Sequence, residues 1–281
     1  MTTPFLLIFG LGYTGSRLAR ECLAAGWRVA GTVRDAAKAE ALRAEGLDAR
    51  VFGADAAPAG VTHVLDTTVP GPQGSAGIAE VRRLGLRPSW LGMLSSSAVY
   101  GDCGGRWVDE TALLAPGSPQ ARARAAAEAE WRAWGAETAT PVQIFRLPGI
   151  YGPGRSALDA VRDGTARRIH RDGHRTSRVH VDDIVAALRL ALAAPLADAV
   201  FNVADDAPAP NPEVVEYACD LLGRPYPPLE RYEDLAPDDP RRRFLADRRL
   251  VVNARLKAAL GWSPRYPTYR EGLAAILAAG G

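Results

Sequence analysis

Three glycines near the start of the chain have the spacing of a dinucleotide-binding turn. The segment FGLGYTGSR places Gly10, Gly12 and Gly15 in the pattern G-x-G-x-x-G. The first glycine allows a sharp turn, the second lets the backbone approach a pyrophosphate, and the third lets a helix pack closely on a strand. A helix that begins at this point also offers unpaired N–H groups to phosphates. We therefore predict that these glycines, with Tyr13 and Thr14, bind a dinucleotide.

The elements around the glycines are those that such a site requires. Five apolar residues, Phe5 to Phe9, predict a buried strand, and the sequence from Ser16 onward predicts a helix with Leu18, Ala19 and Cys22 on one face. Glycines also cluster in plain turns. The strand before the motif and the helix after it favour the nucleotide interpretation.

The end of the next predicted strand bears on the choice of cofactor. Residues 27–33 predict this strand, and Arg34 and Asp35 follow it. An acidic residue at such a place bonds the ribose 2′-hydroxyl of NAD, whereas a guanidinium suits the 2′-phosphate of NADP. Asp35 could take the acidic role, or it could be the N-cap of a helix over residues 36–44. We predict NADP, with NAD as the alternative.

Strands and helices alternate along the first half of the chain. Further strands are predicted at residues 47–52, 61–67, 90–95 and 141–147, with helices at 36–44, at 75–84 and from 118 onward. This alternation predicts an α/β fold with a Rossmann-type, doubly wound parallel sheet. Ligands of such sheets bind beyond the carboxyl ends of the strands. We therefore add Asp55, Thr67, Thr68 and Pro148 to the predicted cofactor-binding residues.

The composition excludes several classes of function. The chain has 281 residues, 47% of them hydrophobic and 23% charged, and a formal net charge of +2. This balance gives no electrostatic footprint for nucleic acid or for a membrane surface. No apolar stretch approaches the roughly 20 residues that span a bilayer, and no basic leader precedes the first strand. The three cysteines are widely separated, so we expect a cytoplasmic protein without a metal site.

Several later segments resemble the extended short-chain dehydrogenase/reductases, the type to which NAD-dependent nucleotide-sugar epimerases and dehydratases belong. The segments are SSSAVYGD at 95–102, VDET at 108–111, FRLPGIYGPGR at 145–155, RVHVDDIVAAL at 178–188, FNVADD at 201–206 and LGW at 260–262. The resemblance implies a Rossmann domain, mainly residues 1–177 with the helix 181–194 returning to it. It also implies a smaller C-terminal substrate lobe, mainly residues 178–281, with the active site between the two.

The resemblance also points to catalytic positions, and this chain departs from the family there. The family uses a Ser or Thr after the fifth strand and a Tyr-x-x-x-Lys on the next helix. Ser96 matches the first, whereas Gln120 stands at the tyrosine position and Arg124 at the lysine position. An amide has no proton to exchange near neutral pH, so the usual acid–base group is missing. Tyr100, Tyr151 and bound water are the candidates to replace it.

Basic residues after the sixth strand suggest an anionic substrate. Ligands bind beyond the carboxyl end of this strand, so we predict Tyr151, Arg155 and Arg178 as substrate residues. The segment 164–177 carries further arginines that could form an anion-binding face or a solvated loop. Nucleotide-sugar epimerases grip a diphosphate with an arginine four residues before the His-Val motif. Thr176 stands at that place here. Asp182 and Asp183, beyond His180, are expected to cap the following helix.

These features define two hypotheses. The first is an NAD(P)-dependent oxidoreductase or epimerase that transfers a hydride to or from a small polar, possibly anionic, molecule through a degenerate catalytic site. The second is a non-catalytic NAD(P)-binding sensor or scaffold. The basic segment 241–249 could be a solvated helix face or the contact of a homodimer.

Overall fold

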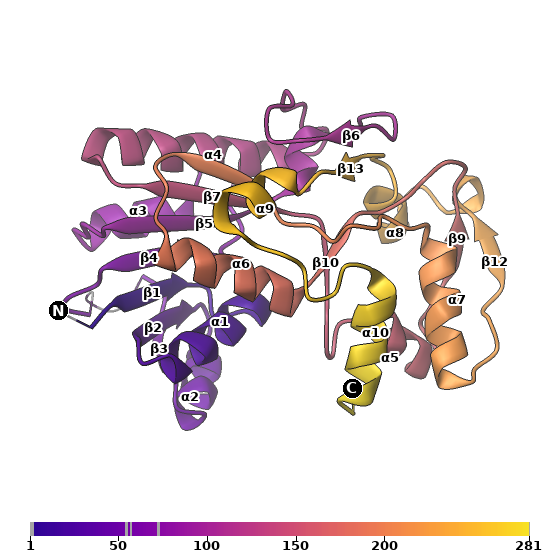
Figure 1. Ribbon diagram of the computed structural model, residues 1–281, viewed down its shortest axis with the longest axis horizontal. Coiled ribbons are helices and arrows are strands. Elements are labelled where there is room, and N and C mark those ends of the chain that lie inside the picture. The colour runs from indigo at the N-terminus through magenta and orange to yellow at the C-terminus, as the bar shows by residue number, and fades with distance from the viewer. Residues whose placement is uncertain (1–2, 54–55, 57, 72–73, 281) are drawn as a thin grey trace. The chain divides into compact units, whose positions relative to one another are not determined.

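The structure is a computed structural model that describes residues 3–53, 56, 58–71 and 74–280 (Figure 1). The chain forms two compact units whose segments interleave along the sequence. Unit 1 comprises residues 1–96, 118–146 and 185–201, and unit 2 comprises residues 97–117, 147–184 and 202–281. The two units differ from the division at residue 177 that the resemblance implies, since residues 97–117 and 147–177 belong to the same unit as the C-terminal part of the chain. The division at residue 177 remains a prediction.

Unit 1 contains the strands and helices of the predicted Rossmann fold. They are β1 (Phe5–Phe9), α1 (Tyr13–Ala24), β2 (Arg28–Val33), α2 (Ala36–Ala44), β3 (Asp48–Val51), β4 (His63–Asp66), α3 (Ala76–Arg83), β5 (Trp90–Ser96), α4 (Pro119–Thr138), most of β7 (Val142–Leu147), most of α6 (Val181–Ala193) and most of β11 (Ala199–Asn202). Each helix of the first half follows the strand that the hydrophobic pattern places before it.

Among the described residues, seven strands form one sheet in the order β11-β7-β5-β4-β1-β2-β3. The pairs β1–β2, β2–β3, β1–β4 and β4–β5 are parallel, and Figure 1 shows these strands side by side, coloured from indigo to magenta. The strand order reverses direction at β1, which is the topological switch of a doubly wound sheet. The predicted α/β fold with a Rossmann-type sheet is confirmed.

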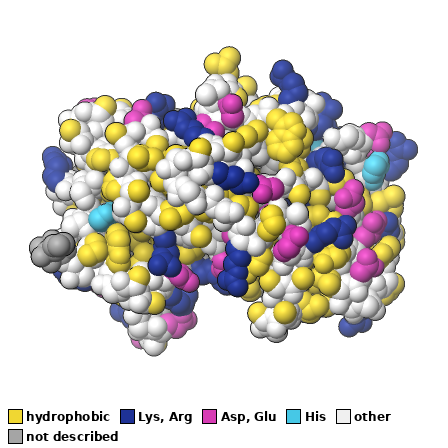
Figure 2. Space-filling model, viewed as in Figure 1, with side chains coloured by type: hydrophobic (Ala, Val, Ile, Leu, Met, Phe, Trp, Pro, Cys, Tyr) yellow, Lys and Arg dark blue, Asp and Glu magenta, His cyan; other side chains and the backbone are white. Residues whose placement is uncertain are grey.

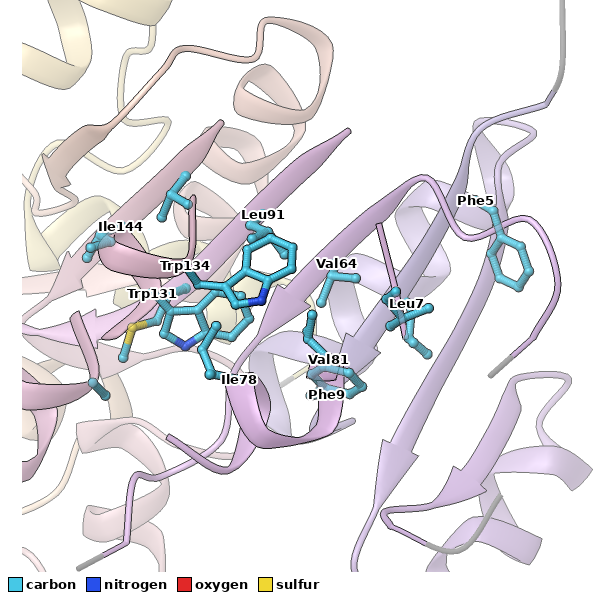
Figure 3. Packing of buried hydrophobic residues seen from close by; sticks show 14 of the residues in the cluster. Phe5, Leu7, Phe9, Val64, Ile78, Val81, Leu91, Trp131, Trp134 and Ile144 are labelled. Carbon is cyan, nitrogen blue, oxygen red and sulfur yellow. The ribbon is translucent and has the colours of Figure 1, made fainter. Parts of the chain in front are cut away.

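Two tryptophans of α4 lie in the core of unit 1. Trp131 and Trp134 are buried and pack with Leu91 of β5 and with Ile78 and Val81 of α3 (Figure 3). Such large rings remove much apolar area from water and so hold the helix against the sheet. The helix begins where Ser118 accepts a hydrogen bond from the Ala121 N–H at 3.1 Å. The two buried rings therefore determine which face of α4 packs against the sheet.

Unit 2 is built from short elements. They are the 3₁₀-turn Ser97–Tyr100, β6 (Trp107–Val108), β8 (Gly149–Tyr151), α5 (Ala157–Arg162), β9 (Arg168–His170), β10 (Arg178–His180), α7 (Asn211–Leu222), β12 (Leu229–Arg231), the 3₁₀-turn Tyr232–Asp234, α8 (Pro240–Phe244), β13 (Leu250–Val251), α9 (Ala254–Leu260) and α10 (Tyr269–Ala278). Three two-stranded parallel pairs, β8–β10, β9–β12 and β6–β13, connect distant segments.

The helices α5, α7 and α10 share a small core in unit 2. Leu158, Ala218, Leu273 and Ile276 are buried in it, and Tyr151 of β8 packs against the same cluster. Capping boxes start two of these helices, at Ser156 for α5 and at Thr268 for α10. These caps fix both helix starts beside the end of β8, where the residues predicted to contact the substrate lie.

Candidate functional site

The three glycines after β1 have different steric surroundings. Gly10 has φ of +100°, and a Cβ atom there would lie 2.5 Å from Thr67 Oγ1. A Cβ on Gly15 would lie 2.3 Å from the carbonyl oxygen of Gly10. Around Gly12, by contrast, no described atom lies within 4 Å of the position that a Cβ would take. The chain's own packing thus requires the first and third glycines, whereas the second borders open space that fits the approach of a pyrophosphate.

A cavity of about 380 Å³ lies beside this turn; we call it the glycine-turn cavity. It collects five of the predicted cofactor-binding residues from separate segments: Gly10, Gly12, Arg34, Thr67 and Thr68. Thr14 and Gly15 lie buried in the first turn of α1, and that helix has no side-chain cap at its N-terminus. An uncapped N-terminus at a glycine turn fits a bound phosphate.

Asp35 acts as a helix cap. Its Oδ1 accepts a hydrogen bond from the Lys38 N–H at 2.7 Å, at the start of α2. The structure thus has the cap that the sequence left open, and Asp35 also lines the glycine-turn cavity, so its acidic role stays a prediction. Lys38 lines the glycine-turn cavity together with Arg34. The sequence analysis missed Lys38, although its place three residues after an N-cap puts it in the first turn of α2.

The loop after β4 is fastened to the glycine turn. Thr67 Oγ1 donates to the carbonyl oxygen of Gly10 at 2.7 Å. Asp66 Oδ1 accepts from both the N–H and the hydroxyl of Thr68, at 2.8 and 2.6 Å. Burial raises the pKa of this Asp66 carboxyl. Thr67 and Thr68 thus shape the cavity wall, and Asp66, which the sequence analysis missed, holds that wall in place.

The predicted catalytic residues of unit 1 lie at the carboxyl end of β5 and on α4. Ser96 is the last residue of β5 and is half-buried. Gln120 is exposed in the first turn of α4, and Arg124 follows one turn later. Arg124 Nη1 donates to the carbonyl oxygens of Thr68 and Leu94, both at 2.9 Å. The guanidinium therefore ties the end of β5 to the loop after β4.

One turn further along α4, a buried ion pair joins this helix to β7. Glu128 accepts from Arg146 Nη2 at 2.7 Å, and the hydroxyl of Ser95 also donates to it. All three residues are at most 5% exposed. Because each charge is paired and hydrogen-bonded, the cluster fixes β5, β7 and α4 relative to one another. The sequence analysis did not predict this cluster.

Tyr100, a candidate proton carrier in unit 2, is buried. Its hydroxyl donates to Asn202 Oδ1 at 2.8 Å, and its side chain is 1% exposed. This placement favours a packing role for Tyr100. Pro148 lies half-buried between β7 and β8, and its contact with the cofactor stays a prediction. Asp55 lies outside the described residues.

The predicted substrate residues meet in a second cavity, within unit 2. Tyr151, Arg155 and Arg178 all line this space of about 450 Å³ between α5, β10 and α10, which we call the α5–α10 cavity. The Tyr151 hydroxyl donates to the Thr268 carbonyl oxygen at 3.3 Å. Burial raises the pKa of Tyr151 far above its usual range. This tyrosine is therefore a poor proton donor near neutral pH.

Three other arginines, in the segment 164–177, bond to carboxylates or backbone carbonyls of unit 2. Arg167 pairs with Glu230 and Asp239, Arg168 pairs with Glu216, and Arg171 donates to backbone carbonyls. Basic and acidic side chains are interspersed on the face in Figure 2. These internal acceptors occupy Arg167, Arg168 and Arg171, so an anion-binding face along this segment stays a prediction.

The expected cap at the start of α6 is also wrong in part. Asp183 accepts from the N–H groups of Arg265, at 2.6 Å, and Tyr266, at 3.2 Å. It thereby fastens the segment before α10 to the start of α6. Burial raises the pKa of Asp183 to about 6. A sequence pattern could not reveal this acceptor role, because the donors lie about 80 residues away.

The sheet order, the glycine turn and the cavity beside it define a Rossmann-type dinucleotide-binding protein. The model of the NAD dependent epimerase/dehydratase family matches residues 78–204, which lie beyond the glycine turn. Over these residues the chain is similar to the NAD dependent epimerase/dehydratase family, in agreement with the resemblance seen in the sequence. None of the helices in the described ranges is long and apolar enough to cross a bilayer.

Three similar proteins illustrate the relationship. A functionally unknown conserved protein from Silicibacter pomeroyi DSS is 40% identical, with 99% of both chains covered and a TM-score of 0.91. Protein YeeZ from Escherichia coli K12 is 28% identical over 92% of this chain and 95% of its own. The UDP-glucose 4-epimerase of Thermus thermophilus, solved as a complex with NAD, is 21% identical, with 98% and 99% covered and a TM-score of 0.75. This last likeness is one of fold.

Proposed function

We propose that the protein is an NADP-dependent oxidoreductase or epimerase that transfers a hydride to or from a small polar substrate bearing an anionic group. The observation that carries the proposal is the glycine-turn cavity, where an open Gly12 and two cations converge. When bound, the cofactor supplies or accepts the hydride. The residues of the chain bind and orient the two reactants.

The preference for NADP rests on how the charges around the cavity are used. Asp35 also lines the cavity, but its Oδ1 is engaged as the cap of α2, which leaves one carboxylate oxygen against two cations. Arg34 and Lys38 both line the cavity and are exposed. Two cations favour the additional phosphate of NADP, because a charge-assisted hydrogen bond to phosphate is stronger than a neutral one.

The anionic substrate rests on the α5–α10 cavity. Arg155 and Arg178 line it together. The UDP-glucose 4-epimerase of Thermus thermophilus, whose fold is similar, is named for a substrate that carries an anionic diphosphate. Thr176 replaces the arginine that grips the diphosphate in such epimerases, so we propose an anionic group without committing to a nucleotide.

At the reacting centre we propose that Ser96 orients the substrate oxygen and that Gln120 donates a hydrogen bond from its amide. Arg124 positions the end of β5 through its bonds to Leu94 and Thr68. The hydroxyls of Tyr100 and Tyr151 both donate to protein acceptors. This favours water over either tyrosine as the source of the proton.

Nicotinamide absorbance during a single turnover tests the proposal. Carbonyl compounds that carry a carboxylate or phosphate would be mixed with the protein and NADPH or NADH. We expect oxidation of NADPH, at a modest rate because general acid–base help is worth about 10²–10⁴-fold. Gln120→Ala should slow the step less than Ser96→Ala, and Tyr100→Phe should match the unmodified protein. Complete loss in Gln120→Ala alone would contradict these roles.

A second candidate function is a cofactor-binding sensor or scaffold. The observation that favours it is Arg124, whose guanidinium serves backbone carbonyls where the family has a catalytic lysine. Under this alternative, NADP binds with normal affinity and no substrate changes the absorbance of the bound nicotinamide.

A further inference from the structure

Buried polar atoms without a partner gather at one place in unit 2. Among the described residues, Thr176 Oγ1, Arg178 Nη1, Asp205 Oδ2 and Tyr269 Oη are shielded from water and make no hydrogen bond. Asp205 and Tyr269 are 2% and 4% exposed. Because a buried polar group without a partner loses its bonds to water and gains none, native proteins rarely leave several together. Such a cluster indicates a missing ligand.

Three of these four residues border the same cavity. Thr176, Arg178 and Tyr269 line the α5–α10 cavity, and each can donate a hydrogen bond. The guanidinium of Arg178 also lies 5.6 Å from the centre of the Tyr269 ring. Its one described hydrogen bond from Nη2 reaches the Ala209 carbonyl oxygen at 3.4 Å, a long contact. Three donors, one of them cationic, would suit a compact oxyanion.

Asp205 lies directly behind the arginine. Its backbone N–H donates to the carbonyl oxygen of Arg178 at 2.8 Å, and its Oδ1 accepts from the Ala207 N–H at 3.3 Å. Arg178 is the cation that acts on this carboxyl, while Asp206 beside it and Asp183 of α6 oppose its ionisation. Tyr151 of β8 and Glu213 of α7 interact electrostatically with the guanidinium of Arg178.

We propose that the α5–α10 cavity is a proton-linked oxyanion subsite, in which Thr176, Arg178 and Tyr269 hold one carboxylate or phosphate and Asp205 must be protonated for it to bind. The inference rests on the proposed function only in assigning this oxyanion to the substrate. A neutral Asp205 leaves the charge of Arg178 to the ligand. An ionised Asp205 neutralises Arg178 and repels a second anion.

The electrostatic surroundings set the pH at which this change occurs. Burial, only partly opposed by Arg178, raises the pKa of Asp205 to about 8. The carboxyl therefore remains protonated through neutral pH and ionises above it. Anion affinity should be constant below about pH 7. It should fall as the pH rises through 8, approaching a tenfold loss for each further unit, as one linked proton requires.

Calorimetric titration of the full chain without cofactor tests the proposal, with inorganic sulfate and acetate as probes whose charge is constant from pH 6 to 9.5. We expect binding without proton exchange at pH 6.5, and uptake of nearly one proton at pH 9. Tighter sulfate binding would identify a phosphate subsite, and tighter acetate binding a carboxylate subsite. Because no cofactor is present, the result is independent of whether hydride transfer is ever observed.

Three variants separate this subsite from a general charge effect. Asp205→Asn should bind the probes with the same affinity at pH 6.5 and 9, and Arg178→Gln should lose at least tenfold. Asp206→Asn is the comparison variant: because that carboxylate opposes the ionisation of Asp205, its removal should start the loss of affinity at a lower pH without abolishing the pH dependence. A pH dependence that survives in Asp205→Asn overturns the proposal. So does failure of the unmodified protein to bind either probe.

Discussion

Among the described residues, each unit contains a buried carboxyl group beside an arginine, and the surroundings of these two combinations differ. In unit 1, Glu128 and Arg146 form a direct ion pair that Ser95 completes. In unit 2, Asp205 and Arg178 influence each other, but each keeps a buried polar atom without a partner. The first arrangement is complete within the protein and fixes the frame of the sheet. The second is incomplete and borders a cavity, so we assign it to binding.

The difference teaches how to interpret a buried charge. Burial by itself does not distinguish a structural charge from a functional one, because both sit in a low dielectric and both interact with a partner. The number of unmade hydrogen bonds does distinguish them. Substitutions at the two acids should therefore have opposite consequences for stability, and this contrast yields the predictions below.

The largest effect should follow from breaking the complete pair. Glu128→Gln removes the charge that faces Arg146 and leaves a buried guanidinium uncompensated, which typically costs about 3–5 kcal/mol. Denaturant unfolding followed by circular dichroism measures this loss. Arg132→Gln is the control, because its partner Asp198 is exposed and a surface pair contributes about 0–1 kcal/mol. Equal effects of the two substitutions would refute the structural role of Glu128.

The next effect concerns cofactor choice in unit 1. Arg34→Ala should weaken NADP by about 1.5–3 kcal/mol, the value of a hydrogen bond to a charged group, and leave NAD almost unchanged. Lys38→Ala should act in the same direction. Thr268→Ala is the matched control, since losing this helix cap of α10 costs about 1 kcal/mol of stability at a residue that does not line the glycine-turn cavity. Fluorescence titration with both cofactors decides the matter, and equal weakening of NAD and NADP would contradict it.

Two glycine substitutions separate packing from ligand approach. Gly15→Ala should destabilise the fold by about 1–3 kcal/mol, because the new methyl group meets the Gly10 carbonyl oxygen. Gly12→Ala meets open space, so the melting temperature should hardly change while cofactor affinity falls. Thermal unfolding and cofactor titration of both variants give the comparison. Retained cofactor affinity in a stable Gly12→Ala variant would place the pyrophosphate elsewhere.

The last prediction tests the incomplete pair through the pH dependence of stability. Because the pKa of Asp205 is raised to about 8 in the folded state, the folded protein holds a proton that the unfolded chain releases near pH 4. Stability should therefore decline as the pH rises between these values, and the decline should end above pH 8. Asp205→Asn should flatten this part of the profile and melt a few degrees higher at pH 8. A variant that melts lower at every pH would show that the carboxylate is needed for folding.

The sequence predicted the features that depend on neighbouring residues. The glycine spacing and the alternation of strands and helices follow from local patterns, and the glycine-turn cavity collects most of the residues that they indicate. Glu128 escaped prediction because its partners Ser95 and Arg146 come from other strands. The ion pairs of Arg167 and Arg168 could not be predicted for the same reason, since their acidic partners lie 48 to 72 residues away.

The distribution of anchored residues along α4 affects which of its positions can mutate during evolution. Arg124, Glu128 and Trp131 follow one another along one helix face and are anchored to strands or core, whereas Gln120 at the exposed start of that face bears none of these attachments. The position that the resemblance assigns to proton transfer is thus separated from those that hold the helix. Natural selection could therefore exchange residue 120 without rebuilding the scaffold. The same separation would let a laboratory lineage vary residue 120 without losing the fold.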